Sequence, residues 1–263
     1  MNFKRLIVAT IFLPFWFAYI YFLPPFPYFF ALLLVCAILA MREFYLMYNI
    51  PQRLYLPCLF IGGILFYVSC RLPAYFLYAF AFSLFFIFLL RLLAVGDPKG
   101  SMSDIGPLGI GFLYISVFLS FQWFLRTETF GMEYIFLLYS SVWTADSMAY
   151  YTGTYIGKNK LFPAVSPNKT IEGAFGSIIG GVLGAVIIKV VFNVPDLTLA
   201  GSAVIGAILG IATLIGDLIE SMFKRDADVK DSGNIIPGHG GILDKIDGLL
   251  VAGPALYFIL RYF

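Results

Sequence analysis

The residues best suited to chemistry are acidic side chains that fall within or at the edge of apolar stretches in the C-terminal part of the chain. They are Asp146, Glu172, Asp217, Glu220, Asp244 and Asp247. An acidic group at the middle of a bilayer costs on the order of 2.5–3.5 kcal/mol on insertion scales, so an idle one is disfavoured. We therefore expect these acids to bind an ion or a ligand.

Spacing groups four of these acids into two pairs. Asp217 and Glu220 are three residues apart, which places them on one face of a helix, and Asp244 and Asp247 repeat the spacing. Two such helices, joined by one loop, could converge on a divalent cation. Oxygen ligands favour magnesium over zinc, and the chain has a single His and no suitable Cys cluster. We predict Asp217, Asp244 and Asp247 as ligands of Mg²⁺ and leave a second cation open.

A simpler explanation of some acids also stays open. Acidic residues in a first helical turn are stabilised by the helix dipole, which would account for Asp244, Asp247 and Glu172 without a metal. Asp146 and Asp217 lie deeper in their apolar runs, where the alternative is a salt bridge that serves packing.

Basic residues and glycines lie between the two acidic pairs. After Ser221 the chain carries, in order, Lys224, Arg225, Lys230 and Asp231, and then Pro-Gly-His-Gly-Gly at residues 237–241. Backbone N–H groups at a glycine-rich turn that enters a helix bind phosphate, and the helix dipole adds to the attraction. Phosphoryl and nucleotidyl transfer need such positioning, cations and charge neutralisation.

A second loop, residues 166–173, offers another phosphate-facing amine. Lys169 stands at the expected start of a helix, followed by Thr170 and Glu172. The alternative is a simply capped helix in which Thr170 is the N-cap.

The amino-acid composition indicates that these residues belong to a membrane protein. Of 263 residues, 61% are hydrophobic and 12% are charged, against about 45–50% and 25% in soluble domains. A helix needs about 20 apolar residues to cross a bilayer. We predict an all-α integral membrane protein with about nine spans: Leu6–Phe22, Tyr28–Tyr48, Leu54–Cys70, Pro73–Val95, Ile105–Leu125, Tyr134–Gly157, Thr170–Phe192, Leu199–Phe223 and Leu243–Leu260.

The basic residues predict how these spans are oriented. With nine spans, Arg71, Arg126, Lys189 and Arg261 fall on one side of the membrane and every other Lys and Arg falls on the opposite side. The positive-inside rule then makes the N-terminus and all the loops described above cytoplasmic, and the C-terminus external. The first apolar run follows Lys4 and Arg5 without a small-residue cleavage site, so we expect a retained signal-anchor helix.

Side-chain size divides this single membrane domain into two parts. Residues 1–130 carry bulky Phe, Tyr and Leu, whereas small residues recur at every fourth position in residues 131–263. Examples are Ala145, Ala149 and Gly153 in the sixth span and Gly173, Ser177 and Gly181 in the seventh. Small residues let transmembrane helices approach closely, so we predict a tightly packed catalytic half.

The motifs resemble the signature of the phosphatidate cytidylyltransferases, also called CDP-diacylglycerol synthases. The resemblance rests on S-x-x-K-R-x4-K-D from Ser221, on P-G-H-G-G-x-x-D-K-x-D from Pro237 and on S-P-x-K-T-x-E-G from Ser166. It also rests on Asp146 with Ala149, Tyr150 and Gly153. It covers roughly residues 141–250. The one departure is Lys245, where the family usually has Arg, so the charge is kept but the bidentate fork is lost.

This resemblance implies an enzyme that transfers CMP from CTP to phosphatidate and releases pyrophosphate. It also implies a magnesium requirement, a homodimer in the inner (plasma) membrane with its site facing the cytoplasm, and no nucleic-acid partner. We predict catalytic roles for Asp217, Ser221, Lys224, Arg225, Lys230, Asp231, His239 and Lys245. Substrate-binding roles are expected for Asp146, Lys169, Thr170, Glu172, Gly238, Gly240 and Gly241.

Two other functions remain as alternatives. A CTP-dependent lipid-alcohol kinase would share the nucleotide and the metal. An ion-coupled transporter would also carry intramembrane acids, but it needs no clustered phosphate-binding loops, and the chain shows no inverted repeat. A P-loop is absent, because residues 153–159 are too short and lack the terminal Ser or Thr. A hydrolase built on Ser221 and His239 would lack a nucleophile elbow.

Overall fold

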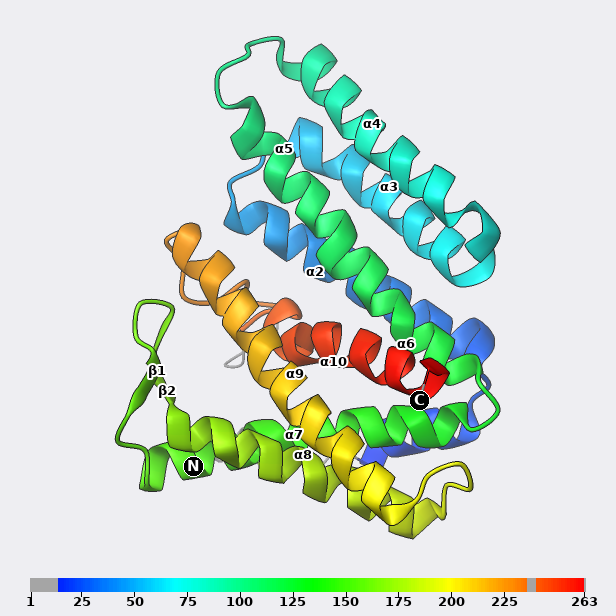
Figure 1. The fold of residues 1–263 in the computed structure, drawn as a ribbon. Coiled ribbons are helices and arrows are strands. Elements are labelled where there is room, and N and C mark those ends of the chain that lie inside the picture. Colours follow the sequence, from blue (N-terminus) through cyan, green and yellow to red (C-terminus); the bar gives the residue numbers. More distant parts are fainter. Residues whose placement is uncertain (1–13, 236–239, 263) are drawn as a thin grey trace.

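The computed structural model describes residues 14–235 and 240–262. Most of these residues are helical (Figure 1). The first part of the chain begins with a helix at residues 14–22. It continues with α2 (Phe30–Met47), α3 (Gln52–Arg71), α4 (Phe76–Val95), α5 (Ser101–Ile110) and α6 (Phe118–Thr127).

Local sequence explains the breaks between these helices. Pro51 precedes the first turn of α3, where a residue without a backbone N–H is tolerated. Gly96 and Gly100 turn the chain between α4 and α5 with φ of 74° and 75°, a left-handed conformation that favours glycine. The π-helical segment Gly111–Val117 joins α5 to α6, so Ser101–Thr127 form one continuous rod.

The second part contains the remaining elements. They are α7 (Gly131–Tyr155), β1 (Lys160–Phe162), β2 (Ser166–Thr170), α8 (Ile171–Phe192), α9 (Leu199–Asp226) and α10 (Leu243–Tyr262). Strands β1 and β2 form an antiparallel hairpin that the sequence did not predict. Thr170 and Thr198 are N-caps, because their hydroxyls accept hydrogen bonds from the backbone N–H groups of Gly173 and Gly201.

Each predicted span coincides with helical structure, the first of them only in its described residues 14–22. Among the described residues, six helices are long and apolar enough to cross a membrane. They are Pro25–Met47, Gln52–Arg71, Pro73–Val95, Ser101–Thr127, Ile171–Phe192 and Leu199–Asp226. The described residues are thus mainly helical and carry several potential membrane spans, as an α-helical membrane protein requires. The number nine stays a prediction, since the helix at residues 14–22, α7 and α10 are not among these six.

Arginines that the sequence predicts on the external side of the membrane lie at one end of the molecule. The guanidinium of Arg71 lies 4.6 Å from the centre of the Phe26 ring, and Arg126 donates a 2.9 Å hydrogen bond to the Ile20 carbonyl. Arg261 lines the same hollow as the C-terminal end of α6. The hairpin and the C-terminal end of α9 lie at the opposite end, on the left in Figure 1.

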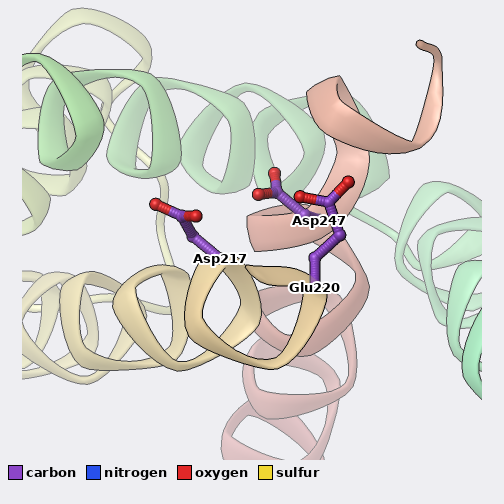
Figure 2. A group of neighbouring side chains, drawn as sticks. All are labelled: Asp217, Glu220 and Asp247. Atoms are coloured by element: carbon purple, nitrogen blue, oxygen red, sulfur yellow. The ribbon is translucent and has the colours of Figure 1, made fainter. Parts of the chain in front are cut away.

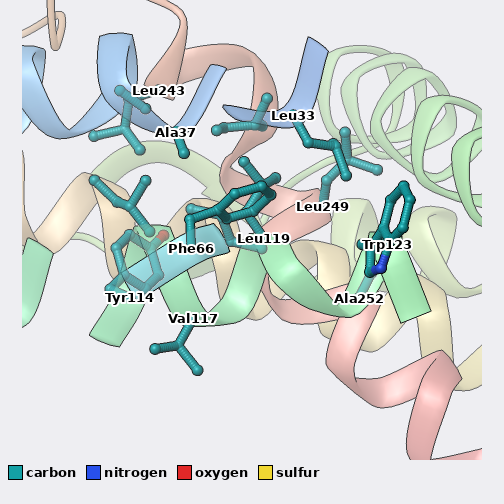
Figure 3. Close-up of a cluster of buried hydrophobic side chains, with 14 of the residues drawn as sticks. Leu33, Ala37, Phe66, Tyr114, Val117, Leu119, Trp123, Leu243, Leu249 and Ala252 are labelled. Carbon is teal, nitrogen blue, oxygen red and sulfur yellow. The ribbon is translucent and has the colours of Figure 1, made fainter. Parts of the chain in front are cut away.

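A core of large side chains holds the N-terminal helices against α10 (Figure 3). The side chains drawn there come from α2, α3, the rod 101–127 and α10, and they include Leu33, Phe66, Trp123 and Leu249. All four are almost completely buried. Helix α10, which carries Asp244 and Asp247, therefore packs on the aromatic part of the molecule as well as on α9.

Helices α7, α8 and α9 pack through small residues instead. The Thr144 hydroxyl donates a 2.6 Å hydrogen bond to the Gly180 carbonyl across α7 and α8, and the Ser177 hydroxyl donates a 2.9 Å bond to the Gly210 carbonyl across α8 and α9. A Cβ atom on Gly181 would collide with the Gly206 carbonyl oxygen. Backbone therefore lies directly on backbone, as the recurrence of small residues predicted.

Candidate active site

Three carboxylates from two helices form the centre of the site (Figure 2). Asp217 and Glu220 project from one face of α9, and Asp247 projects toward them from the first turns of α10. One oxygen atom from each carboxylate lies within 4.8 Å of the other two. We call Asp217, Glu220 and Asp247 the acidic triad. The predicted convergence of two acid-bearing helices is thus present in the structure.

Two lysines flank the acidic triad. Lys169 Nζ lies 2.7 Å from Asp217 Oδ2, and Lys224 Nζ lies 2.5 Å from Glu220 Oε2. The side chain of Asp217 is 39% exposed, so a ligand can reach it, whereas Glu220 is only 1% exposed. The two lysines pair with two of the three acids, and the third, Asp247, forms no ion pair among the described residues.

The donor atoms of the acidic triad fit a hard divalent cation. All are carboxylate oxygens, the ligand type that magnesium prefers. Oε1 of Glu220 is buried and has no hydrogen-bond partner among the described residues. Such an orphaned buried oxygen is costly unless an ion or a water satisfies it. Asp217, Glu220 and Asp247 are therefore a group of residues that could hold a metal ion.

Asp244 makes a different set of contacts and does not belong to the acidic triad. Its Oδ1 accepts a 2.8 Å hydrogen bond from Lys224 Nζ. Its Oδ2 accepts bonds from the backbone N–H and the hydroxyl of Ser232, at 3.1 and 2.9 Å, and from the N–H of Gly241 at 2.7 Å. In this structure Asp244 joins α9, the loop before α10 and the start of α10. Its predicted role as a metal ligand remains a prediction.

Of the predicted site residues on α9, the following loop and the start of α10, some contact the acidic triad and others lie exposed away from it. Ser221 donates a 3.3 Å hydrogen bond from its hydroxyl to Asp217 Oδ1. Arg225 is exposed and donates to the carbonyls of Val165 and Val229, which ties the loop after β1 to the end of α9. Lys230 and Asp231 are exposed on the loop that follows, and Lys245 is exposed in the first turn of α10; the structure brings none of these three side chains into the acidic triad.

The predicted residues around β2 also separate. Lys169 reaches the site through its ion pair with Asp217, whereas the Thr170 hydroxyl caps α8 as the simpler alternative held. The carboxylate of Glu172 accepts hydrogen bonds from the backbone N–H groups of Lys158 and Asn159, at 3.1 and 3.3 Å. Glu172 therefore holds the turn after α7 against α8.

Asp146 borders the site from α7. Its side chain is exposed, and it lies within electrostatic range of Asp217, Lys169 and Lys245. It can therefore face a ligand that occupies the space beside the acidic triad.

The glycine-rich turn is described only in part. Gly238 and His239 lie outside the described residues. Gly240 has a φ of 89°, which explains a glycine there, because this conformation strains any residue with a Cβ. Gly241 follows and donates its N–H to Asp244.

Two acids take positions that the sequence analysis did not assign to them. Glu220 was paired with Asp217 by spacing but was not among the predicted ligands, and the structure places it in the acidic triad. Glu43 on α2 is not among the predicted site residues. It is only 2% exposed and accepts hydrogen bonds from the N-terminus of α10. An acid near the end of a strongly apolar run was the signal that could have identified it.

Comparisons with known proteins identify the family of this chain. The sequence profile of the cytidylyltransferase family matches residues 3–263. A phosphatidate cytidylyltransferase of Bacillus subtilis strain 168 is 40% identical over 166 residues, which is 62% of this chain and 61% of that protein. Proteins of the same name from Thermotoga maritima and Staphylococcus aureus strain COL are 36% and 42% identical, and 62% and 59% of their lengths are covered. The alignments thus cover less than two thirds of each relative. Since the family profile extends over residues 3–263, the chain belongs to the cytidylyltransferase family.

Proposed function

We propose that this protein transfers CMP from CTP to phosphatidate, which yields CDP-diacylglycerol and pyrophosphate. The observation that carries the proposal is the acidic triad, flanked by Lys169 and Lys224 at the ends of membrane-embedded helices, in a chain of the cytidylyltransferase family. The relatives named phosphatidate cytidylyltransferase supply the substrate pair.

Ion pairs within the site support a phosphate-bearing substrate. Lys169 and Lys224 are held beside carboxylates at the site, where both amines can contact phosphate oxygens. Lys230 and Lys245 are exposed nearby in sequence and are free to attract the triphosphate from solution. A lipid phosphate at headgroup depth would approach the same residues from the membrane.

The proposed mechanism is a single in-line displacement. A phosphate oxygen of phosphatidate attacks the α-phosphorus of CTP, and the bond from that phosphorus to the bridging oxygen of pyrophosphate breaks, so no proton has to move. A Mg²⁺ ion held by the acidic triad would neutralise phosphate charge. Lys169 and Lys224 orient the phosphates and stabilise the charge that develops on pyrophosphate.

Ser221 is assigned a positioning role in this mechanism. Its hydroxyl donates to Asp217, and that carboxylate is already paired with Lys169, which makes it a poor base for activating the serine. A direct displacement inverts the configuration at the α-phosphorus and gives no exchange of labelled pyrophosphate into CTP without phosphatidate. Exchange with CTP alone that disappears in Ser221→Ala would instead establish a covalent cytidylyl-enzyme.

Two labels on CTP separate the proposed activity from its alternatives. With purified protein and phosphatidate, label from the α-phosphate should enter the lipid and label from the γ-phosphate should appear in pyrophosphate. A lipid-alcohol kinase would place γ-label in the lipid when diacylglycerol is supplied, and a transporter would label no lipid. Absence of a phosphatidate-dependent α-labelled lipid would refute the proposal.

We further propose that the site faces the cytoplasm, where CTP is found, in a homodimer with nine spans per chain. Arg71, Arg126 and Arg261 lie at the end opposite the site, and the excess of Lys and Arg predicted on the site's side supports this orientation. A reporter fused after Phe263 should then behave as external. Cysteines placed at Asn159 or Ser232 should resist an impermeant thiol reagent in intact cells. A cytoplasmic reporter signal would contradict the nine-span topology.

A further inference from the structure

A buried carboxylate on α2 receives the N-terminus of α10. Glu43 is 2% exposed. Its Oε1 accepts a 3.0 Å hydrogen bond from the N–H of Ile242, and its Oε2 accepts a 2.9 Å bond from the N–H of Leu243. About 200 residues of sequence separate these partners, so the contact joins the two parts of the molecule.

The environment of Glu43 explains how its charge is tolerated. Among the described residues no Lys or Arg forms an ion pair with it. The first N–H groups of a helix have no partner within the helix and carry a partial positive charge. Glu43 therefore satisfies the N–H of Leu243, the first residue of α10, and that of Ile242 just before it. These N–H groups in turn stabilise its carboxylate.

The loop before α10 is shaped around the same carboxylate. The Ser232 hydroxyl lies 2.9 Å from Asp244 Oδ2 and 3.4 Å from Glu43 Oε2. A Cβ atom on either Gly233 or Gly241 would collide with Glu43. Both glycines are therefore needed for the loop to approach Glu43 this closely.

These contacts lead directly to the acidic triad. Asp244 is held by Ser232 and Lys224, and Lys224 also pairs with Glu220. Asp247 lies about one turn beyond Leu243 on α10, so a shift of that helix end moves its carboxylate relative to α9.

We propose that Glu43 is a positioning residue, which holds the start of α10 so that Asp247 stays in reach of Asp217 and Glu220. This role rests on the proposed function, in which the acidic triad holds the metal that the reaction uses. Glu43 itself touches neither substrate nor metal. It acts through the helix end that it caps.

The test is the affinity of the purified protein for Mn²⁺, measured by electron paramagnetic resonance without substrates. Glu43→Gln keeps the size of the side chain but turns an N–H donor toward a backbone N–H, because an amide has only one oxygen. Loss of an outer-shell partner weakens metal binding about 10–100-fold, so we expect a loss near the lower end, about tenfold. Added Mg²⁺ should restore turnover in Glu43→Gln.

Asp104→Asn is the matched control. Asp104 pairs with buried Arg91 at 2.6 Å and helps to hold the turn between α4 and α5, so the substitution makes the same chemical change at a structural contact outside the site. We expect it to lower the melting temperature and leave Mn²⁺ affinity unchanged. Unchanged Mn²⁺ affinity in folded Glu43→Gln, or an equal loss in Asp104→Asn, would overturn the proposal.

A milder variant covers the case in which Glu43→Gln does not fold. Ser232→Ala removes one hydroxyl from the bridge between Glu43 and Asp244, and we expect about threefold weaker Mn²⁺ binding, a fraction of the outer-shell effect. Wild-type affinity in Ser232→Ala would then count against the proposal. Mn²⁺ binding requires no turnover, so the two proposals can fail independently. A wild-type protein that makes no labelled lipid would refute the proposed function, whereas the Mn²⁺ affinities of the variants would still test the role of Glu43.

Discussion

The two parts of the molecule pack by opposite means. In the N-terminal part, large rings interlock: the Phe30 ring lies 5.6 Å from that of Phe66 and 5.4 Å from that of Trp123. In the C-terminal part, α8 lies directly on the backbones of its neighbours at Gly180 and Gly181. Aromatic rings fill the space between helices whose axes stay apart. Glycine backbones let helices come into direct contact and leave no room for another relative position.

This difference matches the placement of the site. Interlocked side chains can repack around a changed volume, but two backbones in contact cannot. The two acids on α9 come from one of the closely packed helices, so the backbone fixes where they lie. Lys169 reaches Asp217 from β2, the strand that leads into α8. Asp247 is also held by a backbone contact, because Gly216 of α9 lies directly on its carbonyl group. Helix α10 differs from the others in that it also rests on the aromatic part, and Glu43 fixes its end.

The largest expected effect comes from the acidic triad itself. Asp247→Asn keeps the size of the side chain and removes its charge, so the metal loses a ligand. Metal stabilisation of transition-state charge amounts to several kcal/mol, so a loss of about 4 kcal/mol, roughly a thousandfold in kcat/KM, is expected.

The matched control for that variant is Asp196→Asn, in the loop between α8 and α9 at the opposite end of the molecule. It should keep full activity in the same assay with labelled CTP. Full activity in Asp247→Asn would mean that this acid only complements the helix dipole.

The next effect separates the two kinds of packing. Gly181→Ala places a Cβ against the Gly206 carbonyl, so overpacking should cost about 1–3 kcal/mol of stability. Gly63→Ala on α3 meets only Ile38 and Leu34 side chains, at 3.7 and 3.8 Å, and should be neutral or gain about 0.5–1 kcal/mol from helix propensity. Thermal denaturation in detergent measures both. Equal melting temperatures would contradict the contrast between the parts.

A smaller effect is expected from the aromatic core. Phe66 is completely buried, and Phe66→Leu removes part of its ring while neighbouring side chains relax, at a cost of about 1–1.5 kcal/mol. Because the site does not depend on this ring, kcat should be unchanged well below the melting temperature. A selective fall in kcat without loss of stability would show that the aromatic part tunes the chemistry.

The smallest effect concerns Lys245, which is exposed in the first turn of α10. If it only neutralises phosphate charge, Lys245→Arg should stay within about threefold of wild-type activity, because an exposed charge contributes about 1 kcal/mol or less. Lys245→Ala should lose clearly more than Lys245→Arg. If both variants behave as the wild type, Lys245 is a solvated charge and leaves the proposed site.

Local features of the chain were predictable to a large extent. Runs of apolar residues placed the helices, and small residues at every fourth position marked the tight contacts of α7, α8 and α9. The three-residue spacing of Asp217 and Glu220 gave their common helix face. These features follow from helix geometry, which depends only on neighbours in sequence.

Non-local features were not predictable in the same way. Asp244 and Asp247 have the same spacing as the first pair, yet Asp244 is bonded to Lys224 and Ser232 while Asp247 points to Glu220. The short hairpin of β1 and β2 was missed as well, since three to five residues between two helices carry too little periodic signal.

The sequence by itself determined the membrane character, the helices and the six candidate acids, from which the acidic triad is drawn. Only the tertiary structure decided which acids share a centre and that Glu43 caps the end of α10. The reason is that sequence spacing fixes a side chain's direction around its own helix axis. The rotation and depth of one helix against another depend on contacts among residues as far apart as Glu43 and Leu243.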